Sequence, residues 1–256
     1  MTGFLARVRR GIAVRARNHW YRNHRIYGRV IELLGNRATL DGVRIRLDNP
    51  AITTDQKVAF PIGEYELAER QLLRYLPPEL PLIDLGASIG VISCIANRRL
   101  KDPSLHVAVE ANPQLLRTLE QNRDLNDCGF NILHAALAYG ADSVEFHLHS
   151  AFTSGSLGGE GEAVTVPART LKSIAEEARF ERFNLICDIE GGELGLINEE
   201  AGFLAERADR LMIEMHDSLL GRDTVDTLDS RLKEHRFQLD SRLQNVYLYR
   251  RIPGGA

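Results

Sequence analysis

The chain has 256 residues, of which 44% are hydrophobic and 26% charged, and a formal net charge of −3 at pH 7. This composition is ordinary for a soluble protein, and the chain is long enough for one α/β domain with additions and a substantial core. No apolar run reaches the length of a membrane span, and the first ten residues lack the apolar segment of a secretion signal. Three scattered cysteines, Cys94, Cys128 and Cys187, predict a cytoplasmic protein without a cysteine metal cluster.

The charge is distributed unevenly. Residues 1–30 contain eight arginines and no acidic residue, so the rest of the chain carries 24 basic against 35 acidic side chains. A helix with a short apolar stripe can be drawn over residues 4–22. We expect this basic arm to meet an anionic membrane surface, a polyphosphate-linked substrate or an acidic partner, with no nucleic acid involved. The structural alternative is that this arm is solvated or packs on its own domain.

Residues 28–48 have the pattern of β-structure. Three short apolar segments are separated by dipeptides typical of hairpin turns. The segments are residues 29–34, 37–40 and 43–47, and the turns are Gly35-Asn36 and Asp41-Gly42. A helix is expected next, over residues 63–76. We therefore predict a basic arm and β-rich lead-in over residues 1–57 and a main domain over residues 58–256.

The main domain is organised around residues 82–91. An apolar run, Leu82–Leu85, ends at a glycine and a second apolar-rich run follows, which predicts a buried strand, a tight turn and a helix. Glycine allows the backbone to turn sharply and to lie close to a ligand, which the helix N-terminus can also bind through its N–H groups. The residues expected around this ligand are Asp84, Gly86, Ala87, Ser88 and Gly90.

Two acidic residues indicate what the ligand is. The spacing Asp-x-Gly-x-x-x-Gly lacks the third glycine of a nicotinamide site. Glu110 closes the next apolar strand, where an acid can bind both ribose hydroxyls of an adenosine, and Ala111 and Asn112 follow it at a helix start. With Asp84 near an amino-acid moiety, the set favours S-adenosylmethionine. An NAD(P)-dependent oxidoreductase, or a βαβ turn with incidental acids, is the alternative.

Strands and helices alternate along the rest of the chain. Helices are expected over about 113–126, 170–179 and 223–235, and strands over 132–138, 144–149, 183–189, 210–215, 237–239 and 246–249. This order favours a mostly parallel sheet with helices on both faces. Residues 150–163 are rich in glycine and serine and could be a linker or a substrate lid. His147 and His149 share one strand face, which a polar surface explains without a metal.

Three more side chains are expected at the carboxyl ends of the strands, where open α/β sheets bind ligands. They are Asp188, Glu190 and His216, and we assign them to catalysis. A neutral histidine can accept the proton of an alcohol as its oxygen attacks a methyl group. Glu193 is interpreted as a helix cap. A divalent ion held by the three residues is the alternative, but we favour a site without metal.

Four motifs in order resemble those of the FkbM-type methyltransferases. They are Asp84-Leu-Gly-Ala-Ser-Ile-Gly90, Val109-Glu-Ala-Asn-Pro113, Asp188-Ile-Glu-Gly-Gly-Glu193 and Ile213-Glu-Met-His216, after a lead-in Phe60-Pro-Ile-Gly-Glu-Tyr-Glu66. The resemblance covers about residues 58–220. Two departures, Ser88 for a common Asn and Gly192 for a common Ala, leave the turns feasible.

The resemblance implies a Rossmann-like class I methyltransferase fold, closed by an antiparallel strand pair, with S-adenosylmethionine as cofactor. It also implies O-methylation, so we expect transfer to a hydroxyl of a sugar on a glycan or glycolipid, or of a small-molecule natural product. A catalytically silent domain, tethered to a membrane or a complex through its basic arm, is the remaining alternative.

Overall fold

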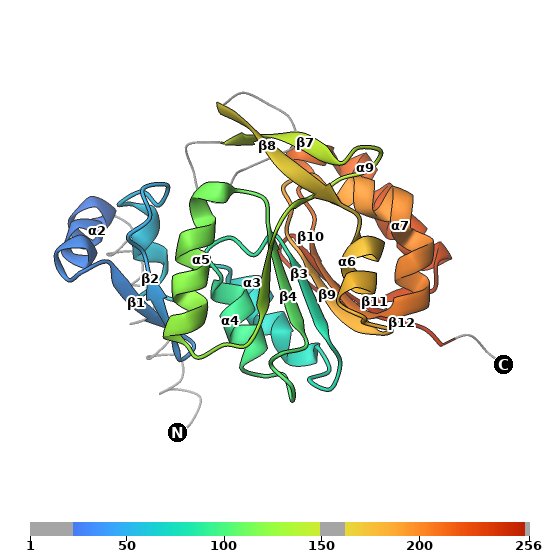
Figure 1. The fold of residues 1–256 in the computed structure, drawn as a ribbon, viewed down its shortest axis with the longest axis horizontal. Coiled ribbons are helices and arrows are strands. Elements are labelled where there is room, and N and C mark those ends of the chain that lie inside the picture. Colours follow the sequence, from blue (N-terminus) through green and yellow to red (C-terminus); the bar gives the residue numbers. More distant parts are fainter. Residues whose placement is uncertain (1–22, 149–161, 254–256) are drawn as a thin grey trace, which may run out of the picture.

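The computed structural model describes residues 23–148 and 162–253 (Figure 1). A seven-stranded sheet lies at its centre, in the order β11-β12-β10-β9-β3-β4-β5. The strands are β3 (Leu82–Leu85), β4 (His106–Glu110), β5 (Asn131–His134), β9 (Phe183–Cys187), β10 (Ala208–Glu214), β11 (Phe237–Leu243) and β12 (Val246–Arg251). Neighbours from β5 to β10 are parallel, whereas β12 is antiparallel to both β10 and β11. The predicted Rossmann-like α/β class, with its closing antiparallel pair, is confirmed.

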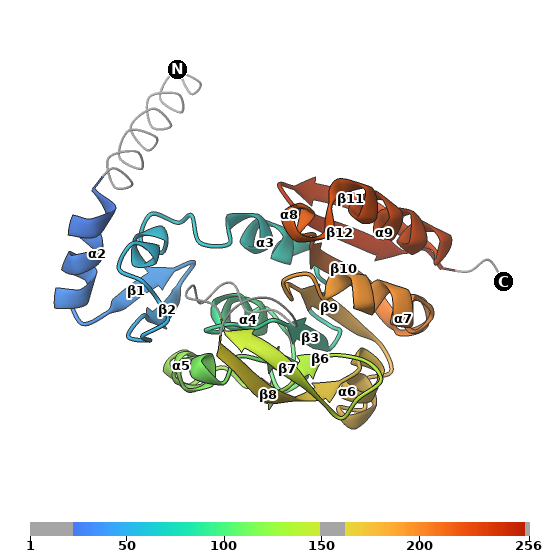
Figure 2. The same ribbon diagram turned by 90° about the horizontal axis from the view of Figure 1, so that it is seen from above.

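Helices cover both faces of this sheet, which explains why its central strands are continuous apolar runs. Every residue of β3, β4 and β9 is buried. On one face pack α6 (Leu171–Glu177), α7 (Glu193–Arg207) and α9 (Arg222–Glu234), and on the other α3 (Leu67–Leu72), α4 (Val91–Asn97) and α5 (Pro113–Leu125) (Figure 2). The short helix α8 (Asp217–Leu220) follows β10.

The lead-in departs from its prediction in one element. The hairpin of β1 (Arg37–Leu40) and β2 (Val43–Arg46) is confirmed, with its turn at Asp41-Gly42. The strand predicted over residues 29–34 is wrong, because this stretch belongs to helix α2 (His24–Leu33). Gly35 and Asn36 do not form a hairpin turn. Both have positive φ and end the helix, a conformation that is usually taken by glycine and sometimes by asparagine.

The lead-in is fastened to the sheet domain by side-chain amides of α5. Asn122 accepts a hydrogen bond from the Arg46 N–H at 2.7 Å and donates one to the Ile89 carbonyl at 2.8 Å.

Beyond the 3-10 turn η1 (Gln56–Ala59), the helix predicted over residues 63–76 is shorter. It begins as α3 only after Glu66, whose φ of 43° is left-handed, and it ends in the 3-10 turn η2 (Leu73–Tyr75). The division at residue 58 stays a prediction.

A second, three-stranded sheet lies across the carboxyl ends of the central strands (Figure 1). The strand predicted over residues 132–138 is in fact two, because the chain leaves the central sheet after β5 and forms β6 (Ala136–Leu137). This strand pairs with β8 (Glu162–Arg169), which pairs in turn with β7 (Ser143–Leu148). The sequence indicated β7 but not β8.

Three predictions fall outside the described residues, namely the helix over residues 4–22, most of the stretch 150–163, and the pairing of His147 with His149. Within the described ranges, no helix has both the length and the hydropathy needed to cross a membrane.

Candidate active site

The turn between β3 and α4 requires glycine at its first position. Gly86 has a φ of 89°, and a Cβ atom there would lie 1.7 Å from the carbonyl oxygen of Asp188, so no other residue fits. The N–H groups of Gly86 and Ala87 both donate to the carbonyl of Val109, at 3.0 and 2.9 Å. Gly90 has a φ of 83° and precedes α4. The turn is thereby held against both β4 and β9.

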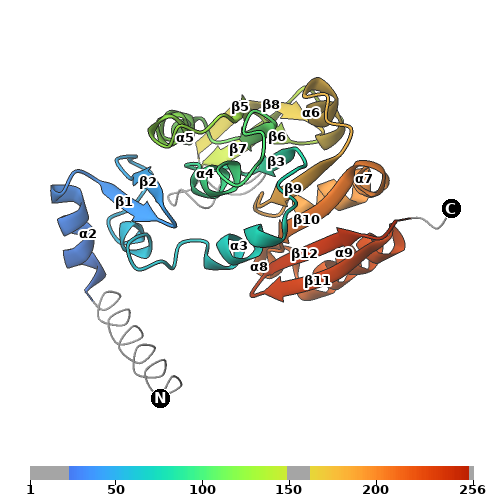
Figure 3. The same cartoon turned by 90° about the horizontal axis from the view of Figure 1, so that it is seen from below.

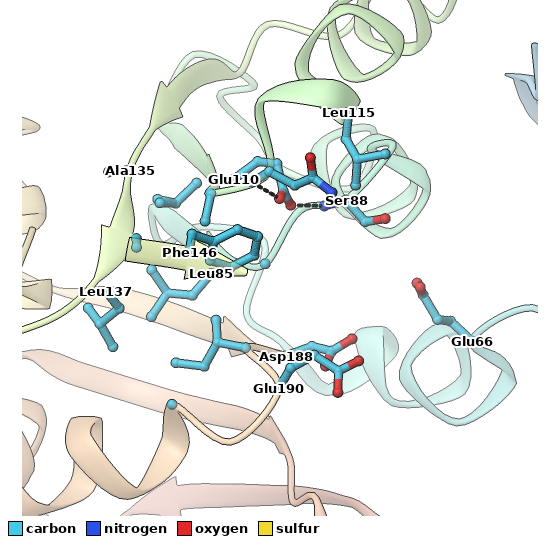
Figure 4. A pocket seen from close by; sticks show the side chains of 17 residues that line it. Glu66, Leu85, Ser88, Glu110, Leu115, Ala135, Leu137, Phe146, Asp188 and Glu190 are labelled. Carbon is cyan, nitrogen blue, oxygen red and sulfur yellow. Dashed lines mark hydrogen bonds between the residues drawn. The ribbon is translucent and has the colours of Figure 1, made fainter. Parts of the chain in front are cut away.

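Glu110, at the end of β4, holds this turn from the other side. Its two carboxylate oxygens accept hydrogen bonds from the backbone N–H groups of Ser88 and Asn112, each at 2.6 Å (Figure 4). Burial raises the pKa of Glu110 to about 7, although both hydrogen bonds act to lower it. A carboxylate offers about four acceptor positions, so roughly two remain for the hydroxyls of a ligand.

A cavity lies beside this turn, with about 770 Å³ of empty space including its open mouth. One wall is apolar and the other acidic (Figure 4). The apolar wall includes Leu85, Val109, Leu115, Ala135, Leu137 and Phe146, and the acidic wall includes Glu66, Asp188 and Glu190. An apolar slot next to a carboxylate that can bind two hydroxyls suits a nucleoside, and an acidic wall suits a cationic group.

Five of the eight predicted cofactor residues line this cavity, namely Gly86, Ser88, Glu110, Ala111 and Asn112. Asp84, Ala87 and Gly90 do not belong to its lining. The Asp84 side chain is 2% exposed and accepts a hydrogen bond from the Ser93 hydroxyl at 2.5 Å, so it joins β3 to α4. Burial raises its pKa to about 6. A contact between Asp84 and the amino-acid end of a ligand stays a prediction.

The three predicted catalytic residues come together at the ends of β9 and β10. The His216 Nε2 atom lies 3.4 Å from a carboxylate oxygen of Asp188 and 3.4 Å from one of Glu190. Its Nδ1 atom lies 2.9 Å from the Glu193 carboxylate, which is fully buried. Because a carboxylate accepts, Nδ1 carries the proton, and the neutral imidazole presents Nε2 as the acceptor.

This cluster is strongly negative. Burial acts to lower the pKa of His216, but the hydrogen bond that it donates to Glu193 and the charges of Glu193, Glu190 and Glu214 together raise it to about 8. Burial, reinforced by the charge of Glu214, raises the pKa of Asp188 well above its usual range. With a pKa of about 8, His216 is mostly protonated at pH 7 in the free protein, so the role of base predicted from the sequence requires this pKa to fall. A cation bound nearby would lower the pKa of His216, so that its Nε2 atom could accept a proton.

Four acidic residues of this cluster were not assigned to the site from the sequence. Glu193 does accept from the Ile189 N–H at 3.3 Å, as a cap would, but its closer partner is His216. Glu66 lines the cavity from the start of α3, and Glu69 on the same helix is buried beside Glu214, so that burial and the Glu214 charge raise its pKa to about 8. The position of Glu66 in the lead-in motif was the only signal, since α3 precedes β10 by more than a hundred residues.

Asp188, Glu193 and His216 could also hold a metal. Each offers one ligand atom, and these three atoms lie within 4.8 Å of one another. Two carboxylates and an imidazole form a donor set that divalent ions accept. The preference for a metal-free site therefore stays a prediction.

The sequence matches the profile of a family described as the methyltransferase FkbM domain over residues 84–239, more than half of the chain. The chain belongs to the FkbM methyltransferase family. It is therefore an S-adenosylmethionine-dependent methyltransferase, as the resemblance implied, and the oxidoreductase alternative is excluded. None of the curated proteins matches the chain.

Several solved structures are similar to this FkbM-family protein at low identity. The precorrin-6y C5,15-methyltransferase of Geobacter metallireducens is 14% identical, with 71% of this chain and 83% of that one covered and a TM-score of 0.43. An rRNA methylase of Streptococcus thermophilus is 14% identical, with 75% and 97% covered and a TM-score of 0.45. The TYW2 protein of M. jannaschii in complex with AdoMet is 16% identical, with 83% and 84% covered and a TM-score of 0.39.

The cavity fits S-adenosylmethionine. Glu110 retains acceptor positions for the ribose hydroxyls, the apolar wall suits the adenine ring, and the Gly86 backbone allows close approach. When bound, the cofactor supplies a methyl group activated by a sulfonium. The acidic wall of Asp188 and Glu190 is suited to the positive charge that this group carries.

We predict that Glu110→Ala weakens cofactor binding by about 2–4 kcal/mol, a roughly 30- to 900-fold rise in Kd, because a charged acceptor of two hydroxyls is lost. Isothermal titration calorimetry measures this directly. Glu145→Ala, on the exposed side of β7, is the control and leaves Kd unchanged. Unchanged affinity in the Glu110 variant would remove this residue from the cofactor site.

We predict that Glu193→Gln lowers the pKa of His216 from about 8 to roughly 7 or below, because the carboxylate that stabilises the imidazolium is lost while the burial remains. Titration of the histidine ring protons by NMR measures it, with His235 in the same spectra as the internal control. A His216 pKa that stays near 8 would show that Glu193 does not control this imidazole.

Proposed function

We propose that this methyltransferase transfers the methyl group to a hydroxyl oxygen of a sugar or a related polyol, on a glycan, a glycolipid or a natural product. The observation that carries the proposal is the orientation of His216. Glu193 holds its Nδ1 atom, and its Nε2 atom is directed at Asp188 and Glu190, which line the cavity. His216 is thus in contact with two residues of the cavity lining and with a buried carboxylate, which supports its role as the proton acceptor.

The reaction needs such an acceptor. When bound, S-adenosylmethionine would supply the methyl group to the hydroxyl oxygen and would leave as a neutral thioether. His216 would accept the hydroxyl proton at Nε2, so that the single positive charge is kept, on the imidazolium. Glu193 stabilises that imidazolium. Alignment of oxygen, carbon and sulfur supplies much of the remaining acceleration.

The protonation state of His216 is coupled to the cofactor. In the free protein its pKa is about 8, so at pH 7 the imidazole is mostly charged. A sulfonium bound at the acidic wall adds positive charge nearby and lowers this pKa. The base therefore becomes available when the methyl donor is in place.

The acidic wall supports a polyhydroxylated acceptor. Asp188, Glu190 and Glu66 all present carboxylates to the cavity, and carboxylates accept hydrogen bonds from several neighbouring hydroxyl groups. An acceptor with an anionic reacting group would be repelled by the same wall. The family resemblance, which implies O-methylation of sugars and natural products, supports the same choice.

We predict that His216→Ala lowers turnover at least about a hundredfold, the low end of a general-base contribution. Cofactor affinity stays near that of the wild type, since the imidazole is assigned to the acceptor side. Single-turnover transfer of a labelled methyl group measures the rate, and calorimetry measures the affinity. Near-normal turnover would remove the histidine from the mechanism.

The acceptor class is tested with labelled S-adenosylmethionine and fractionated glycan, lipid and small-molecule extracts. We expect label in a hydroxylated glycan, lipid or small-molecule fraction, and the product releases no label under conditions that hydrolyse methyl esters. Label in protein or RNA instead would overturn the proposal.

We also predict that turnover survives a chelator, because the proton passes to His216 without a metal. Addition of EDTA to the purified enzyme, followed by magnesium or manganese, is the measurement. Activity lost in EDTA and restored by either ion would assign Asp188, Glu193 and His216 to a metal centre instead.

A further inference from the structure

Helix α2 presents an apolar face to solvent. Nine large hydrophobic side chains are exposed among the described residues, and four of them lie in α2 or directly after it. They are Ile26, Val30, Leu33 and Leu34, which are 63%, 42%, 87% and 74% exposed. The first three are spaced by four and three residues, so they lie along one side of the helix. Such a stripe is too regular to be scattered surface apolar residues.

The opposite side of α2 is fixed on the lead-in. Gly28 and Ile31 are buried, and a Cβ atom on Gly28 would lie 2.1 Å from the carbonyl oxygen of Thr54. Glu32 accepts hydrogen bonds from Lys57 at 2.9 Å and from the Thr54 hydroxyl at 2.8 Å. The helix therefore cannot rotate to bury its stripe. It lies at the end of the molecule far from the sheet (Figures 2 and 3).

Positive charge borders the stripe. Arg25 and Arg29 are exposed and four residues apart, which places them in a row beside Ile26, Val30 and Leu33. They belong to the 30-residue stretch that holds eight arginines and no acidic residue. The acid of α2, Glu32, is already paired with Lys57. An apolar stripe beside a cationic row is the pattern of a helix that lies in the plane of a membrane interface.

We propose that α2 docks this methyltransferase on an anionic lipid surface. Ile26, Val30 and Leu33 would enter the boundary between headgroups and acyl chains, and Arg25 and Arg29 would lie among the phosphates. An acidic protein would complement the charge of the arginines. It would not explain why aliphatic side chains such as Leu33 are exposed. A second copy seated across a two-fold axis would bring two arginine-rich stretches together, which is unfavourable. An anionic bilayer satisfies both features.

The test uses the full chain and sedimentation with vesicles of phosphatidylcholine, with and without phosphatidylserine. We expect partitioning onto the anionic vesicles, weakened by added salt, and little onto the neutral ones. The double variant Ile26→Ser, Leu33→Ser should lower the partition coefficient at least about tenfold. Ile252→Ser, at an apolar position 43% exposed near the other end of the chain, is the matched control and should keep it.

A second variant guards against a folding defect. Arg25→Gln with Arg29→Gln changes only exposed side chains and should weaken binding to anionic vesicles several-fold and reduce its salt dependence. Absence of binding by the wild type, or binding by both double variants that equals that of the wild type, would overturn the proposal. It would also fall if sedimentation showed a wild-type dimer that Leu33→Ser dissociates, because the stripe would then be covered by a second copy.

Discussion

The structure depends on the contact between the end of β3 and the end of β9. The carbonyl oxygen of Asp188 lies where a side chain at position 86 would have to lie. The two strand ends therefore touch through their backbones, and the Asp188 N–H closes the contact by donating to Leu85 at 2.9 Å. This close approach brings the turn at Gly86 and the turn that carries Asp188 and Glu190 into the lining of one cavity.

Repulsion among the carboxylates of the acidic wall destabilises the protein when no cation lies nearby. Four carboxylates lie within 3.9 Å of the His216 ring, and Glu66 and Glu69 add further negative charge from α3. Burial raises the pKa of Glu66, Glu69 and Asp188, so their charged forms are disfavoured in the free protein. A positively charged donor bound beside them would favour the charged forms, which couples cofactor affinity to pH.

The sequence predicted those parts in which local pattern and tertiary role agree. The runs that became β3, β4 and β9, and the cap at Asn112, were readable because buried parallel strands and helix starts have local signatures. Helix α2 could not be predicted in this way, because the dipeptide Gly35-Asn36 is compatible both with a hairpin turn and with the end of a helix. The role of Glu193 was hidden for another reason. A glutamate in the first turn of a helix is normally interpreted as a cap. Only the three-dimensional structure, in which the end of β10 lies beside the start of α7, shows that Glu193 supports His216.

The lining of the cavity comes from two sheets. The ends of β3, β4 and β9 belong to the central sheet, where substitutions also disturb the core. Leu137 and Phe146 belong to the sheet of β6, β7 and β8, which contributes only a small buried cluster. Substitutions of Leu137 or Phe146 should therefore reshape the apolar side of the cavity while the core of the central sheet stays intact. The second sheet can therefore change the shape of the cavity without a change in the strands that carry Glu110 and Asp188.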